Sequence, residues 1–219
     1  MKNNGLNAFS SWSGGKDSCL ALHRSLAGGN AVTVLLTILH ESGGFLRTHG
    51  TPRALIQRQA ESLGLSIRFG NSTWEGYESA FKEEIAGLKA GGVGAGVFGD
   101  IDLAEHREWI ERVCAEVEIE PLLPLWGEKR GDLVAEFIDL GYRAMIISVR
   151  KGTLSGDWLG KTLDRPALSA LEEQGVDAAG EGGEYHTFVY AGPLFRHAVD
   201  LRPGGIEERD GMLRLQLET

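Results

Sequence analysis

The stretch SSWSGGKDSCLALH, residues 10–23, decides the fold of this chain, and its centre is the run SGGKDS at residues 13–18. Two adjacent glycines allow the backbone to approach an anion closely, while the flanking hydroxyls add donors and the lysine adds a positive charge. A short apolar segment precedes the run and a helical pattern follows it. The positive end of the helix dipole would therefore face the same anion. The run predicts a phosphate-binding loop between a strand and a helix.

This run differs from the phosphate loop of kinases and GTPases. That pattern, G-x-x-x-x-G-K-[ST], requires a glycine at Ser10 and a hydroxyl residue at Asp17, and both positions differ. A glycine-rich turn that only connects strand to helix is the structural alternative for the same residues.

The run instead resembles the SGGKDS signature of the PP-loop ATP pyrophosphatases. This resemblance implies that the chain binds the β and γ phosphates of ATP and cleaves between the α and β phosphates, so that an acceptor is adenylated. Under this hypothesis the loop amides and hydroxyls hold the departing pyrophosphate, and the lysine neutralises the charge that grows there. The nucleotide-binding residues expected from the loop are Ser13, Gly14, Gly15, Lys16, Asp17 and Ser18, of which Lys16 and Ser18 are also expected to be catalytic.

Strand and helix patterns alternate from this loop to about residue 124, which predicts an α/β fold with an open parallel sheet covered on both faces. With the resemblance, the fold class is the PP-loop, Rossmann-like type. The expected strands are residues 7–12, 31–39, 65–69 and 95–98, and the expected helices carry apolar stripes over residues 19–26, 51–63, 77–88 and 103–117.

Ligands of open parallel sheets bind at the carboxyl ends of the strands. The SGGKDS loop follows the first expected strand and Gly99-Asp100-Ile101-Asp102 follows the fourth, so both are expected at one crevice. Asp100 is the leading candidate to hold the Mg²⁺ that accompanies ATP, and Asp17 is a second candidate. Asp102 lies two residues after Asp100, but aspartates at these positions also cap helices, as Asp17 does in the simpler interpretation. His49, in a glycine-flanked loop, is a further candidate for the nucleotide pocket or a surface histidine.

The pattern changes after residues 121–126, where two prolines interrupt the chain. We therefore expect a nucleotide-binding domain over residues 1–124 and a smaller α+β domain over residues 125–219. The smaller domain is expected to contain a helix, a strand, a second helix after Pro166 and a hairpin around Asp210-Gly211.

A second motif, GEGGEYHTF, occupies residues 180–188. Its two carboxylates, Glu181 and Glu184, are suited to hold a metal, a substrate amine or a ribose hydroxyl, and His186 is suited to transfer a proton. A solvated acidic turn before a strand is an equal alternative on spacing alone.

Four further segments accompany the two motifs in order along the chain: residues 99–101, 124–126, 158–160 and 192–195. Taken together from about Ala8 to Phe195, the sequence resembles the diphthine–ammonia ligase family. The resemblance implies a cleft between two domains, a carboxylate acceptor activated with ATP, and ammonia that displaces AMP to form an amide. Glu181 and Glu184 are then expected on the acceptor or ammonia side as catalytic residues.

His186 departs from the family pattern. Archaeal and eukaryotic enzymes of this resemblance commonly read EGGEYE-T, with a glutamate where this chain has His186. The acceptor is therefore left open between a modified protein residue, as in elongation factor 2, and a small acid, as in cobalamin salvage. No glutaminase-like segment is evident, so free ammonia is the expected nitrogen donor.

The composition and charge of the chain limit the classes of partner that we expect. The net charge of −9 and the lack of a basic run disfavour a nucleic acid, and the two cysteines, Cys19 and Cys114, do not form the pair used in tRNA thiolation. No apolar stretch reaches the roughly 20 residues that span a bilayer, and no signal peptide is evident, so a cytoplasmic protein without membrane contact is expected. The competing hypotheses are a PP-loop enzyme that acts on tRNA and a non-catalytic ATP-binding regulator.

Overall fold

The computed structural model describes residues 5–46 and 50–218, and the chain divides into two compact units. Unit 1 comprises residues 1–13, 17–47 and 64–127, and unit 2 comprises residues 14–16, 48–63 and 128–219. The chain therefore passes from one unit to the other within the SGGKDS loop and on each side of residues 48–63. Each unit is built on a sheet of its own.

The sheet of unit 1 has five parallel strands in the order β3-β2-β1-β4-β5. Strand order reverses between the neighbours β1 and β4, which is where open α/β sheets bind ligands. The predicted parallel sheet is thus confirmed. Its strands are β1 (Asn7–Ser11), β2 (Ala31–His40), β3 (Ser66–Ser72), β4 (Ala95–Val97) and β5 (Glu120–Leu122).

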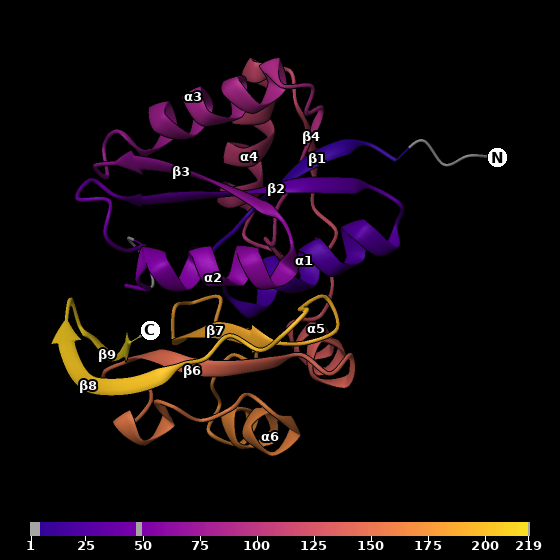
Figure 1. The fold of residues 1–219 in the computed structure, drawn as a ribbon. Helices are drawn as coiled ribbons and strands as arrows, with labels where there is room; N and C mark the ends of the chain where they lie inside the picture. The colour runs from indigo at the N-terminus through magenta and orange to yellow at the C-terminus, as the bar shows by residue number, and fades with distance from the viewer. Residues whose placement is uncertain (1–4, 47–49, 219) are drawn as a thin grey trace. The chain divides into compact units, whose positions relative to one another are not determined.

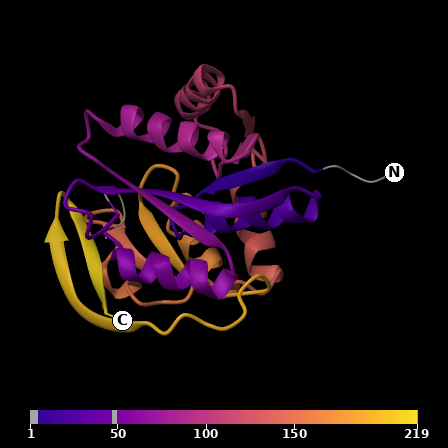
Figure 2. The same cartoon turned by 45° about the horizontal axis from the view of Figure 1, so that its top comes forward.

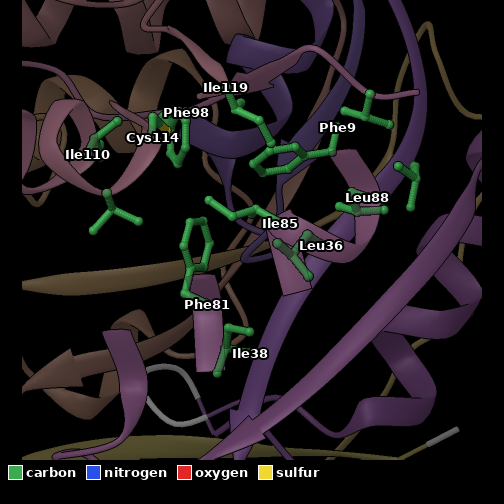
Figure 3. Close-up of a cluster of buried hydrophobic side chains, with 13 residues drawn as sticks. Phe9, Leu36, Ile38, Phe81, Ile85, Leu88, Phe98, Ile110, Cys114 and Ile119 are labelled. Atoms are coloured by element: carbon green, nitrogen blue, oxygen red, sulfur yellow. The ribbon is translucent and has the colours of Figure 1, made fainter. Parts of the chain in front are cut away.

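Helices cover both faces of this sheet. Helices α3 (Tyr77–Ala90) and α4 (Ala104–Val117) lie on one face, and α1 (Lys16–Ala27) lies on the other (Figure 1). The apolar stripes of α3 and α4 pack against the sheet in the core shown in Figure 3, where Phe9, Phe81 and Phe98 meet with ring centroids 5.9–6.3 Å apart. Such aromatic contacts favour tilted and edge-on geometry, which these rings adopt.

Strand β5 was not predicted from the sequence. Pro121 stands in the middle of its three residues, and a proline argues against a strand because it donates no ladder hydrogen bond. The position of β5 at the edge of the sheet resolves the conflict, since it pairs only with β4. Phe98 N then donates to Leu122 O at 2.9 Å and continues the contact beyond the ladder.

Unit 2 has a four-stranded antiparallel sheet in the order β7-β6-β9-β8. The predicted hairpin is confirmed: Asp210 and Gly211 both have positive φ, 54° and 73°, as a two-residue turn of type I′ requires. Strands β8 and β9 run side by side in Figure 2, and every residue of β8 is exposed. The strands are β6 (Arg143–Arg150), β7 (Tyr185–Ala191), β8 (Arg202–Arg209) and β9 (Met212–Glu218).

The helices of unit 2 are α2 (Arg53–Leu63), α5 (Arg130–Asp139) and α6 (Arg165–Glu173), with a 3₁₀ turn η1 (Gly156–Trp158). Helix α6 begins where the sequence placed it, because Asp164 accepts a hydrogen bond from Ala167 N at 2.9 Å as the N-cap and a proline follows in the first turn. Helix α2 follows the predicted start at Thr51-Pro52 and buries Ile56, Gln59 and Ala60.

Tyr77 packs, partly buried, against the core of unit 1. Burial, and to a smaller extent the negative charge of Asp100, raise the pKa of Tyr77 to about 12. The raised pKa favours the neutral phenol in the folded protein, so this contribution to stability is complete below the ordinary tyrosine pKa of about 10 and is lost between about pH 10 and pH 12.

We expect Tyr77→Phe to lose less stability than the unsubstituted protein when the pH rises from 9 to 11.5, by up to about 2 kcal/mol. Urea unfolding followed by circular dichroism at both pH values measures the difference. Equal losses in the two proteins would contradict the assignment.

Candidate active site

The part of the SGGKDS loop that belongs to unit 1 surrounds the start of α1. Ser13 Oγ and Ser18 Oγ lie 3.2 Å apart, within hydrogen-bond distance, and Ser18 is buried. Asp17 is the second residue of α1, inside its first turn. A carboxylate in the first turn interacts favourably with the helix dipole.

Gly99 packs against the same turn. A Cβ built on Gly99 would come within 2.8 Å of both Asp17 C and Ser18 N, and these are backbone atoms that cannot swing away. The loop after β4 and the loop after β1 therefore meet backbone to backbone, as their expected position at one end of adjacent strands requires. Gly99 is needed here for close approach and not for an unusual backbone angle.

We expect Gly99→Ala to weaken ATP binding at least tenfold and to lower the free energy of unfolding by about 1–3 kcal/mol, because the added methyl group displaces the start of α1. Gly94→Ala is the matched control, since a Cβ there meets nothing within 4 Å. Calorimetric titration with ATP and urea unfolding measure the two effects. Similar behaviour of the two variants would refute the role of this contact.

Residues 14–16 of the loop lie along the free edge of β7 in unit 2. Val189 N donates to Gly14 O at 2.9 Å, and Lys16 N donates to Thr187 Oγ1 at 3.1 Å. Gly14 has a φ of 79°, in the left-handed region that favours glycine. The motif of residues 180–188 thus contributes, through Thr187, a direct hydrogen bond to the phosphate-loop motif.

Gln59 holds this arrangement from α2. Its fully buried side chain donates from Nε2 to Gly14 O at 3.0 Å and to Val189 O at 2.6 Å. A Cβ on Gly14 would meet Gln59 Oε1 at 2.6 Å. The sequence analysis did not select Gln59. A signal was available, because Gln59 shares a helical face with the apolar residues Ile56 and Ala60, and a buried amide needs hydrogen-bond partners.

The ammonium group of Lys16 is buried in unit 2. It donates a hydrogen bond to Ala179 O and lies 5.4 Å from the ring centroid of Tyr185, a distance typical of a cation–π contact. The Tyr185 hydroxyl in turn donates to Ala178 O. In this structure the lysine therefore points its charge at the backbone just before the GEGGEYHTF motif.

Asp177 organises that motif. Its carboxylate accepts from Ala179 N at 3.1 Å, from Glu181 N at 2.8 Å and from Arg130 Nη1 at 2.7 Å. Asp177 was not selected from the sequence, because it lies outside the glycine-rich run and no spacing marks it.

Arg150 holds the second half of the motif. Its backbone N donates to Glu184 O at 2.7 Å, and its Nη2 donates to Gly182 O at 2.6 Å. Glu184 Oε2 is buried without a hydrogen-bond partner in the described part of the chain. Hydrogen bonds to the backbone thus brace the turn that precedes β7.

We expect Asp177→Ala to lower the free energy of unfolding by about 2–4 kcal/mol, because it leaves the Arg130 guanidinium and two backbone amides without their acceptor. The exposed Ser155–Asp157 pair supplies the control, and Asp157→Ala should cost about 0.5 kcal/mol or less. Urea unfolding compares the two variants, and equal losses would contradict the organising role.

Two acidic residues, Asp100 and Asp102, follow β4. Asp100 Oδ1 lies 3.0 Å from His106 Nδ1, on the first turn of α4. The N-cap position of α4 is Leu103, which makes no side-chain cap, and Asp102 is the residue before it. Among residues 5–46 and 50–218, no group of three or more histidine, cysteine or acidic side chains is arranged to hold a metal ion.

Three further sequence expectations concern His49 and the cysteines. His49 lies outside the described residues. Cys19 and Cys114 are both buried, and neither forms a disulfide bond. Burial raises the pKa of the Cys114 thiol to about 12, which leaves it unreactive as a nucleophile.

Two family domains match this chain: residues 7–121 match the diphthamide synthase N-terminal domain, and residues 129–213 match the diphthamide synthase C-terminal domain. The chain belongs to the diphthine–ammonia ligase family. It is 30% identical to the human diphthine–ammonia ligase over 221 residues, which cover 85% of this chain and 79% of the human protein. The bovine diphthine–ammonia ligase is 37% identical over 123 residues, 54% of this chain and 43% of that protein.

This membership confirms the resemblance stated from the motifs and makes the chain an ATP-dependent ligase of the amidating class. A crystal structure described as a predicted subunit of tRNA methyltransferase from Methanocaldococcus jannaschii aligns at 16% identity with a TM-score of 0.48, covering 86% of this chain and 98% of that one. That likeness is too low to inform function. None of the helices in the described ranges has the length and apolarity to cross a membrane.

Proposed function

We propose that this chain joins ammonia to a carboxylate acceptor in amide linkage, with cleavage of ATP to AMP and pyrophosphate. The observation that carries the proposal is the SGGKDS loop at the reversal of strand order, packed against Gly99, in a chain that matches both domains of a family of amidating ligases. We assign nucleotide binding to residues 1–124 and acceptor binding to residues 125–219.

In the first step an acceptor carboxylate oxygen attacks the α phosphorus of ATP, and the bond to the β-phosphate oxygen breaks. The acyl adenylate and pyrophosphate are the products. Ammonia then attacks the acyl carbon, the bond to AMP breaks, and the added nitrogen loses a proton. Each step needs stabilisation of negative charge on a leaving phosphate, which preorganised donors supply.

The loop residues take these roles in the proposal. The amides of Gly14 and Gly15 and the hydroxyls of Ser13 and Ser18 hold the pyrophosphate, and Lys16 neutralises its charge. The structure adds one requirement: the Lys16 ammonium must exchange the carbonyl of Ala179 for phosphate oxygens when ATP binds. The carbonyl keeps the buried charge solvated until then.

Mg²⁺ enters the proposal with ATP. It uses one or two protein carboxylates and completes its shell with phosphate oxygens and water, so a single aspartate suffices. Asp100, at the carboxyl end of β4 beside Gly99, fits this demand, and Asp17 on the first turn of α1 is the second candidate. The ion would offset the phosphate charge that develops during adenylation.

On the acceptor side we assign Glu181 and Glu184 to positioning the acceptor or ammonia. The relatives are named for diphthine, so a protein residue of that kind is one acceptor class and a small carboxylic acid is the other. The net charge of −9 continues to disfavour tRNA. The two cysteines are buried and form no disulfide bond, which agrees with a reducing compartment such as the cytoplasm.

We expect Lys16→Ala to reduce acceptor-dependent release of AMP and pyrophosphate by about 10²–10³-fold, as loss of one preorganised donor typically does. The assay contains MgATP, ammonium and, in separate reactions, a diphthine-bearing protein or a deproteinised small-molecule extract. Lys89→Ala, at an exposed lysine of α3 paired with Glu118, is the matched control and should keep full activity.

Release of ADP and phosphate instead of AMP and pyrophosphate would overturn the mechanism. ATP binding without turnover in either reaction would favour the regulatory alternative. Stimulation by tRNA alone would favour the nucleic-acid alternative.

A further inference from the structure

A row of polar residues crosses the sheet of unit 2. Ser148, on β6, lies directly opposite His186 on β7 and opposite Arg214 on β9. Residues that are opposite each other in a sheet project from the same face, with Cβ atoms about 5 Å apart. Ser148 and Arg214 are therefore neighbours on one face, although they are far apart in the sequence.

The segment before α2 reaches the same arginine. A Cβ on Gly50 would stand 3.4 Å from Arg214 Cδ, which is ordinary contact distance, so this backbone packs against the aliphatic stem. Thr51 follows immediately and is 2% exposed. The contact brings Thr51, Ser148 and Arg214 into one neighbourhood within unit 2.

Each of these three side chains has a buried polar atom without a hydrogen-bond partner in the described ranges. The atoms are Thr51 Oγ1, Ser148 Oγ and Arg214 Nε. Ser148 is fully buried, and Arg214 as a residue is half-buried. Buried polar atoms are nearly always paired in folded proteins, so three such atoms without a partner among the described residues point to a bound ligand.

The chemistry of the three groups selects that partner. Arginine cannot lose its proton and only donates hydrogen bonds, and its Nε together with one Nη forms a planar fork that matches the two oxygens of a carboxylate. The two hydroxyls can donate to the remaining lone pairs of the same oxygens. Glu207 lies opposite Arg214 on β8, so it projects from the same face of the sheet, and it is exposed to solvent.

We propose that Thr51, Ser148 and Arg214 form a subsite that binds a carboxylate group of the acceptor. This inference rests on the proposed ligase function and deepens it, because it makes the acceptor an acid recognised by an arginine fork and two hydroxyls. These are binding residues, and no bond is made or broken at them.

The test follows the Nε–Hε signals of the arginines by NMR, with ¹⁵N-labelled arginine, during titration with acetate at constant ionic strength. Arg214→Lys removes one signal and so identifies it, and Arg202→Lys, at an exposed arginine of the same sheet, is the matched control. We expect the Arg214 signal to shift and saturate, while the signals of exposed arginines shift weakly and without saturation.

Thr51→Val and Ser148→Ala retain Arg214 and change side-chain volume little, so they test the subsite if Arg214→Lys fails to fold. Each should weaken acetate binding by about tenfold, the effect of removing one hydrogen bond to a charged group. An Arg214 signal that does not saturate, that is insensitive to both variants, or that saturates with inorganic phosphate and not with acetate would overturn the proposal.

Ligase turnover and acetate binding, both measured on the unsubstituted protein, separate this inference from the ligase function. Saturable acetate binding in a protein without ligase turnover would count against the ligase function and leave the subsite standing. Ligase turnover in a protein that binds no acetate at Arg214 would count against the subsite alone.

Discussion

The proposed nucleotide site depends on one constraint, the close contact of two backbones at the carboxyl ends of β1 and β4. Gly99 touches the start of α1 so closely that no side chain can stand between them. Neighbouring parallel strands end at the same edge of the sheet, so a side chain at position 99 would push the loop after β4 away from α1. Glycine at this position keeps the first turn of α1, with Ser18, tight against the strand ends.

A second constraint acts on residues 14–16, which belong with the antiparallel sheet of unit 2. An edge strand presents unpaired backbone groups, and β7 uses one of them, Val189 N, to bind Gly14 O. Gln59 closes the arrangement by donating to the carbonyls of both residues. The phosphate-loop motif is therefore shaped by strand β7 and helix α2 as well as by its own glycines.

The same logic applies to the acidic motif. Glycine-rich turns lose much conformational freedom when they order, and here the Asp177 carboxylate accepts a hydrogen bond from Glu181 N while the Arg150 guanidinium donates one to Gly182 O, which offsets that loss. Neither residue lies in the glycine run that attracts notice in the sequence. Residues outside the motif thus hold its backbone at Glu181 and Gly182.

Most of the fold could be predicted from local sequence patterns. The periodic stripes of α3 and α4, the apolar run of β2, and the Asp210-Gly211 turn all appear where they were expected, because each reflects chemistry of neighbouring residues. Strand β5 was not predicted, because Pro121 argues against a strand unless that strand lies at the edge of a sheet. Whether a strand lies at an edge depends on the strand order of the whole sheet. Residues 14–16 and 48–63 belong to unit 2, and nothing in their local composition indicates this.

The short motifs alone indicate the chemistry: SGGKDS predicts a phosphate loop, GEGGEYHTF predicts an acidic, glycine-rich partner, and their order along the chain indicates the family. The distant groups that contact these motifs could be identified only in the folded chain. Gln59, Asp177, Ser148 and Arg214 acquire their roles through strand register, helix packing and burial, which depend on contacts between residues tens to more than a hundred positions apart. Short motifs record the groups that touch a ligand, whereas a hydrogen bond between distant elements exists only after the chain has folded.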